Sequence, residues 1–172
     1  MKFAKVLMTC AALALAAGPL TAQDSTNVVS TNTAWSVFEE PQGCWAVATA
    51  KETVNTRDGR VVAVKRGDIL LYVIYNQAQG VNGQVAFTGG YPFADDSKVE
   101  VNVDGTKFQL FVQGEWAWAS SADEDAKLVA AMKRGSNAVM TARSSRGTQT
   151  KDTFSLLGFT AATDEAAKRC AG

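Results

Sequence analysis

Hydrophobic and polar residues alternate in short runs along most of the chain, and Gly, Asn and Asp interrupt these runs. Alternation with a period of two predicts strands that bury one face, and closely spaced turn residues predict antiparallel pairing. Residues 68–75 contain an apolar run, 69–75, without alternation, which predicts a central strand covered on both faces. Further strands are predicted over residues 34–38, 44–50, 84–88, 98–103, 108–112, 115–119, 137–142 and 153–157.

Two Asp-Gly dipeptides are candidate hairpin turns. Asp104-Gly105 separates two strictly alternating runs, which is a strong signal for a two-residue turn. A turn there places Val101 opposite Phe108, and apolar pairs with apolar along the whole hairpin. Asp58-Gly59 offers a second turn, although it would place two Arg residues opposite each other.

Two segments predict helices. Residues 121–124 read Ser-Ala-Asp-Glu, a capping box that begins a helix, and Asp123 can pair with Lys127 along it. Residues 163–169 carry acids at the start and bases at the end, as the helix dipole favours. The whole pattern predicts a mainly β fold: an antiparallel β-sandwich with one or two short α-helices, rather than a closed barrel.

The first 22 residues have the three parts of a secretory signal peptide: early Lys residues, an apolar stretch over 6–17, and small residues before a cleavage point after Ala22. Ala17 is the second choice for cleavage. The apolar stretch is shorter than the roughly 20 residues of a membrane-spanning helix, so no transmembrane anchor is expected. The chain is therefore predicted to be periplasmic or exported to the cell surface.

The remainder divides into a flexible leader over 23–33, rich in Ser, Thr and Asn, and a single domain over 34–172. After cleavage the domain keeps two cysteines, Cys44 and Cys170. An even pair in an exported chain predicts one disulfide that fastens the C-terminal tail to an early strand.

Composition excludes several kinds of chemistry. The chain has no His, which removes Ser-His-Asp and Cys-His catalysis and His-ligated zinc. Equal numbers of basic and acidic residues, 17 each, argue against nucleic-acid binding. Neighbouring carboxylates such as Asp95-Asp96 do not converge as an acid–base pair, and no calcium-loop, P-loop or Gly-x-Ser-x-Gly spacing occurs. The sequence predicts no enzyme, metal or cofactor.

One loop concentrates positive charge and hydroxyl groups. Arg143, Ser144, Ser145 and Arg146 lie between two predicted strands, with Lys151 close behind. Such a loop can bind a carboxylate, phosphate or sulfate, and Arg146 would make the main contact. The alternative is a solvated loop whose Arg residues pair with Asp152 or other acids.

Aromatic residues mark two more candidate sites. Tyr91 lies in the motif Gly89-Gly90-Tyr91-Pro92-Phe93, which suits an exposed binding loop or a corner that turns rings into the core. Trp116 and Trp118 share one face of a predicted strand. They could stack against a sugar or peptide, or belong to the core.

Several short motifs together resemble the invasion-associated locus B (IalB) family of exported bacterial proteins. They span most of the mature chain: Trp35, Cys44-Trp45, Gly89-Gly90-Tyr91-Pro92-Phe93, Ala117-Trp118, Ser144-Ser145-Arg146-Gly147-Thr148, Asp152-Thr153-Phe154-Ser155-Leu156, Gly158-Phe159 and Cys170. The resemblance implies a β-rich periplasmic or surface-associated domain of a Gram-negative bacterium, with family members linked to entry into host cells. It supplies no catalytic residues.

The residues and the resemblance together predict an exported, non-enzymatic domain that binds an envelope or host-surface protein or an anionic ligand. Two alternatives remain at this level: an envelope hydrolase whose Ser or carboxylate site forms only in the fold, and a structural envelope protein. A cleft with converging acids would favour the hydrolase, and a cationic or aromatic patch would favour binding.

Overall fold

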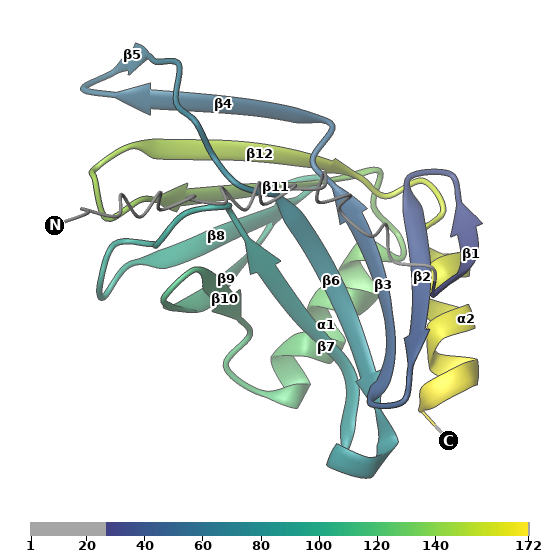
Figure 1. Cartoon of the computed structure of the whole chain (residues 1–172). Coiled ribbons are helices and arrows are strands. Elements are labelled where there is room, and N and C mark those ends of the chain that lie inside the picture. Colours follow the sequence, from purple (N-terminus) through teal and green to yellow (C-terminus); the bar gives the residue numbers. More distant parts are fainter. Residues whose placement is uncertain (1–26, 172) are drawn as a thin grey trace, which may run out of the picture.

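A computed structural model describes residues 27–171, in which twelve strands form one antiparallel sheet with two helices packed against it (Figure 1). The predicted signal peptide lies outside the described residues. Across the sheet the strands follow the order β1-β2-β3-β6-β7-β10-β9-β8-β11-β12-β4-β5. Their bounds are β1 Val28–Asn32, β2 Trp35–Glu40, β3 Gly43–Thr49, β4 Glu52–Arg57, β5 Arg60–Val61, β6 Leu70–Asn76, β7 Val81–Thr88, β8 Lys98–Val103, β9 Thr106–Gln113, β10 Trp116–Trp118, β11 Asn137–Arg143 and β12 Gln149–Ser155. The helices are α1 Ala122–Met132 and α2 Phe159–Cys170, and one 3-10 turn covers Gln77–Gln79.

The sheet bends until its two halves face each other. In Figure 1, β11 and β12 run across the direction of β6 and β7. Phe87 on β7 meets Phe154 on β12 with ring centroids 6.0 Å apart, although these strands are not neighbours in the sheet. The predicted mainly antiparallel β fold is confirmed. Its two layers belong to one sheet, because β10 pairs with β7 on one side and with β9 on the other.

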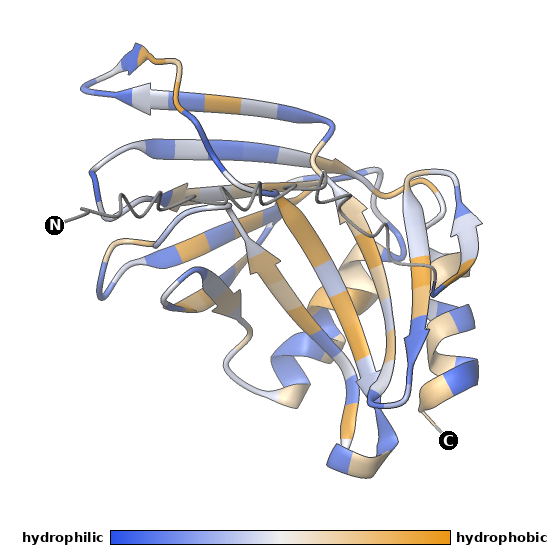
Figure 2. Cartoon of the chain, viewed as in Figure 1, coloured by the Kyte–Doolittle hydropathy of each residue, from blue (hydrophilic) through white to orange (hydrophobic). Residues whose placement is uncertain are grey.

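The core lies between the bent sheet and the helices, and strand alternation determines which residues enter it. Along β6, Leu71, Val73 and Tyr75 are buried, whereas the intervening residues stay partly exposed. The prediction that both faces of this strand are covered is wrong. Figure 2 shows the hydrophobic residues concentrated on β3, β6 and β7. One face of this half of the sheet therefore supplies core residues, and the other carries large side chains that meet solvent.

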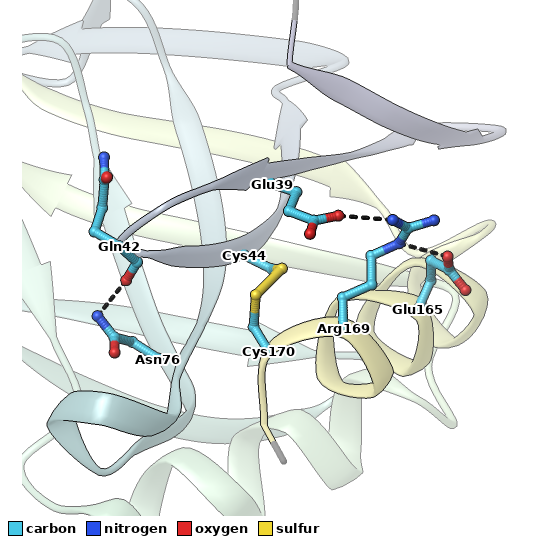
Figure 3. The surroundings of a disulfide bond; sticks show 7 residues. All are labelled: Glu39, Gln42, Cys44, Asn76, Glu165, Arg169 and Cys170. Carbon is cyan, nitrogen blue, oxygen red and sulfur yellow. Dashed lines mark hydrogen bonds and ion pairs between the residues drawn. A yellow bond between two sulfur atoms is a disulfide. The ribbon is translucent and has the colours of Figure 1, made fainter.

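The C-terminal helix is fastened to the sheet by the predicted disulfide. Cys44 on β3 and Cys170 on α2 are bonded, with their Cα atoms 5.6 Å apart (Figure 3). Beside them, Arg169 Nη1 contacts Glu39 on β2 at 2.7 Å. Helix α2 begins at Phe159, four residues before the predicted start, because the fully buried Phe159 ring packs edge-on against Trp35 at 4.8 Å.

Both predicted hairpins form. The Asp104-Gly105 turn gives the predicted register, including Val101 opposite Phe108. The second turn joins β4 to β5 and does place Arg57 opposite Arg60. Both Arg side chains are exposed, so water screens their repulsion.

Three local features differ from the sequence expectations. Residues 28–32, assigned above to a flexible leader, form β1 and pair with β2. Strand β12 begins at Gln149, earlier than expected, because its polar first half pairs with β4 and β11. One half of the capping box forms, with Ser121 Oγ accepting from the Glu124 amide at 3.3 Å. The Glu124 carboxylate pairs with Lys127 at 2.7 Å, so Lys127 pairs with Glu124 rather than with Asp123. Neither helix within residues 27–171 has the length and apolar character to cross a membrane.

Replacing Gly105 with Val tests the turn that sets the β8–β9 register. Asp104 and Gly105 both have positive φ, 45° and 102°. A Cβ at Gly105 would meet no atom within 4 Å, so the strain comes from the backbone conformation alone. Gly105→Val should lower the free energy of unfolding by more than about 1 kcal/mol in urea, because β-branched residues fit this region poorly. Gly105→Asn, which tolerates positive φ better, should lose less; an unchanged unfolding midpoint for the Val variant would contradict this account.

Removing the disulfide should lower the thermal midpoint by several degrees. The bond joins residues 126 positions apart. Cross-links of this kind contribute about 2 to 5 kcal/mol, and roughly 2 to 4 °C follow from each kcal/mol in a domain of this size. Reductant should lower the midpoint of the wild type and leave Cys44→Ala/Cys170→Ala unchanged. Two free thiols in folded protein isolated from the periplasm, measured by mass spectrometry, would refute the pairing.

Candidate functional site

A buried ion pair lies where the two halves of the sheet meet. Arg66 precedes β6, and its Nη1 and Nη2 donate to the two carboxylate oxygens of Asp152 on β12 at 2.7 and 2.6 Å. Only 6% of the Arg66 side chain and none of the Asp152 side chain is exposed. Burial raises the pKa of Asp152, and the hydrogen bonds from Arg66 oppose that rise. The bidentate geometry is the one that best offsets the cost of burying two charges.

A close approach of two glycine residues places Arg66 beside the segment Gly89–Phe93. The Gly67 amide donates to the Gly90 carbonyl at 2.9 Å. Gly90 has φ 71°, and a Cβ there would come within 2.5 Å of the Gly67 carbonyl oxygen, so only glycine fits. Arg66 Nε then donates to the Gly89 carbonyl at 2.8 Å, and the guanidinium carbon lies 4.9 Å from the centre of the Tyr91 ring.

The Tyr91 hydroxyl completes this cluster. It lies 2.6 Å from the Thr150 hydroxyl, within hydrogen-bond distance. Burial raises the pKa of Tyr91 to about 12, so the phenol is neutral and keeps its proton for hydrogen bonding at physiological pH. Tyr91 is thus held between a guanidinium and a hydroxyl, which fixes the position of its ring.

Above this cluster is a groove of about 520 Å³, hereafter the cationic groove. Its lining comes from β4 and β12, from residues before β6, from the turn before β10, and from the loops that precede β8 and follow β11. The lining residues are Arg57, Val64, Lys65, Arg66, Gly90, Tyr91, Pro92, Glu115, Ser144, Ser145, Arg146, Thr148 and Thr150. The volume is within the range of small-ligand sites.

The groove carries an excess of positive charge. Arg57, Lys65 and Arg146 line it, and none of the three forms an ion pair with any residue in 27–171. Arg57 Nη2 donates instead to the Thr148 hydroxyl at 2.7 Å. Glu115 is the single acidic residue among the lining side chains that the structure describes. Hydroxyl groups and cations without an ion-pair partner among the described residues therefore line the same groove.

The structure brings together most, not all, of the predicted anion-binding residues. Ser145 and Arg146 are exposed in the groove, and Tyr91 forms part of its floor. Ser144 also lines it, but its hydroxyl accepts from the Thr148 amide at 3.1 Å and so closes the loop. Arg143 does not line the groove.

One part of the alternative is wrong: the loop arginines do not pair with Asp152, because Arg66 occupies that carboxylate. Arg143 and Arg146 are both exposed, as the solvated-loop alternative expects. Sequence reasoning missed Arg57 and Lys65, which come from distant segments. The Asp58-Gly59 turn was the available signal, since a hairpin there places Arg57 at its tip.

Trp116 and Trp118 lie outside the cationic groove. Their rings stack at 5.8 Å, and Trp116 meets Tyr72 of β6 at 5.7 Å. These residues line a second groove on the outer face of the sheet. The predicted binding residues therefore separate into two sites.

Comparison with known families decides the affiliation of the chain. The family model described as "Invasion associated locus B (IalB) protein" matches residues 39–167. The chain belongs to the IalB family. A crystal structure of invasion associated protein b from Bartonella henselae shares the IalB fold with a TM-score of 0.55 at 17% identity, covering 81% of this chain and 96% of that chain. No curated protein matches the sequence.

Removing one partner of the buried Arg66–Asp152 pair should lower the free energy of unfolding more than removing an exposed charge does. Asp152→Ala leaves the Arg66 guanidinium buried without a counter-ion, so the free energy of unfolding should fall by about 3 to 5 kcal/mol. Arg66→Met/Asp152→Leu removes both charges and should lose less than the single variant. Asp95→Ala, at an exposed carboxylate, should stay within about 0.5 kcal/mol of wild type. A small effect of Asp152→Ala in urea unfolding would show that the pair does not stabilise this junction.

Proposed function

We propose that this IalB-family chain is an exported, non-enzymatic binding protein of the bacterial envelope. In this proposal the cationic groove recognises a carboxylate, phosphate or sulfate group on an envelope or host-surface ligand. The observation that carries the proposal is the group of three cations, Arg57, Lys65 and Arg146, that line one groove without a carboxylate partner in the described part of the chain. The signal-peptide pattern and the disulfide support export.

The chemistry of the groove fits an anionic group. A guanidinium donates two parallel hydrogen bonds that match a carboxylate or phosphate, and Arg146 is free to turn toward such a group because it is exposed. Ser145, Thr148 and Thr150 add hydroxyl groups to the same lining. Arg66 contributes little net charge, since Asp152 neutralises it.

The groove does not favour acid–base catalysis. Its lining contains one carboxylate, Glu115, and no second acid converges on it among the described lining residues. Because general acid–base hydrolysis uses a proton donor and a proton acceptor in one site, this arrangement supports binding rather than hydrolysis. The comparison family and the Bartonella protein carry invasion in their names, which supports a ligand on a host or envelope surface.

Calorimetric titration with a heparin octasaccharide and with inorganic pyrophosphate tests the proposal. Arg57→Ala/Arg146→Ala should raise the Kd for the better probe about tenfold or more, because two charge-assisted contacts are lost. Arg146→Lys should also weaken binding, since the charge remains but the planar fork is lost. Affinity should fall as salt rises.

A matched variant separates groove recognition from general charge attraction. Arg60→Ala/Lys151→Ala also removes two positive charges, at exposed positions that do not line the groove. It should bind both probes within about twofold of wild type, a difference well below the 1.4 kcal/mol that corresponds to tenfold. Equal losses in the two double variants, both of wild-type thermal stability, would refute the groove as the site, as would the absence of binding to both probes at physiological salt.

A further inference from the structure

The outer face of the sheet carries a cluster of aromatic side chains. Cys44 on β3 points toward α2, to which it is bonded, so the next residue, Trp45, points to the opposite face. The same alternation places neighbouring aromatic residues of β2, β6 and β10 on that outer face. This aromatic face consists of Phe38, Trp45, Tyr72, Trp116 and Trp118. It holds three of the four tryptophans in the chain.

The rings form two stacked groups. Phe38 and Trp45 are nearly parallel, with an interplanar angle of 11° and centroids 6.1 Å apart. Trp116 and Trp118 stack at 30°, and Tyr72 adjoins Trp116. Two grooves of about 410 and 430 Å³ run over these rings, and both are lined by Trp45 and Tyr72. They therefore form one continuous surface across five neighbouring strands, β2, β3, β6, β7 and β10.

This surface is neutral and bears amide groups. In a chain with 20% charged residues, no Asp, Glu, Lys or Arg is among the described residues that line either groove. The polar lining comes mainly from amides: Gln42, Asn76, Gln79 and Gln84. Two of these amides are engaged. The Asn76 side chain accepts from the Gln79 backbone amide and donates to the Gln42 carbonyl, and the Gln42 side chain donates to the Glu40 carboxylate. No side-chain hydrogen bond to a described residue occupies the amide of Gln84.

We propose that the aromatic face binds a neutral oligosaccharide. The apolar faces of pyranose rings present C–H groups that stack on indole and phenol rings, while their hydroxyl edges donate to and accept from side-chain amides. A surface with stacked tryptophans, an unoccupied side-chain amide at Gln84 and no charged residue in its described lining matches both features. Trp116 is 38% exposed, so its ring is available without rearrangement of the fold.

The aromatic face and the cationic groove differ in lining and in chemistry. No residue lines both. A neutral sugar should therefore bind equally well to the wild type and to Arg57→Ala/Arg146→Ala. This independence separates failure of the sugar proposal from failure of the anion proposal.

Hexasaccharides of β-1,4-linked glucose and of β-1,4-linked N-acetylglucosamine are suitable probes. Tryptophan fluorescence should change on titration with at least one of them, because most of the indoles lie on the aromatic face. Saturation transfer from the aromatic protein resonances should reach the ring C–H protons of the bound sugar. Trp116→Ala should raise the Kd about tenfold or more, as expected for loss of a stacking ring.

Val61→Ala is the control. Val61 is an apolar residue, 77% exposed on β5, that lines neither groove of the aromatic face. The exposed Phe111 is unsuitable because it is the cross-strand partner of Trp118. The Val61 variant should bind sugar as the wild type does, and Gln84→Ala should weaken binding without loss of the fold. Three results would overturn the proposal: no binding of either hexasaccharide to the wild type, equal affinities of the Trp116 and Val61 variants, or sugar-free sedimentation showing a dimer that Trp116→Ala dissociates.

Discussion

The buried pair of Arg66 and Asp152 joins segments that are far apart in the chain. The guanidinium also donates to the Asn55 side chain at 3.1 Å and to the Gly89 carbonyl, so β4, β12, the end of β7 and the approach to β6 meet at one group. Burying two charges carries a large desolvation cost, which only complete hydrogen bonding offsets. Every buried side-chain polar atom in the described structure has a partner. The bend of the sheet at this junction therefore depends on a network that tolerates little displacement.

The same pair determines which positive charges of the groove are available for binding. Because Asp152 neutralises Arg66, the floor of the cationic groove is close to neutral, and Arg57, Lys65 and Arg146 supply the unpaired charge at its sides. The guanidinium also holds Tyr91 by its ring face, and Thr150 holds the hydroxyl. A groove whose floor is fixed and whose cations are exposed is preorganised in shape, while its charged groups can still turn toward a ligand.

Sequence patterns predicted the features of the structure that depend on residues close together in the chain. The alternating runs around Asp104-Gly105 predicted the β8–β9 register residue by residue, and the capping box predicted the start of α1. The sandwich was predicted only as a layered arrangement, since no local pattern shows that β10 links the two halves into one sheet. The residues of the cationic groove also fall into a part that was predicted and a part that was not. Ser145 and Arg146 are local to one loop and were predicted, whereas the groove cations Arg57 and Lys65 arrive through tertiary contacts that leave no periodic signal.

Strand β10 shows how one short element serves two surfaces. Glu115, directly before it, reaches the cationic groove, and Trp116, its first residue, reaches the aromatic face. Glu115 belongs to the turn between β9 and β10, and the change of side takes place where this turn meets the strand. Its neighbour Ala117 is fully buried against the core, which fixes the strand between the two. In this bent sheet, consecutive residues thus line a charged groove and a neutral one. Because no residue lines both, each surface can be altered without changing the lining of the other.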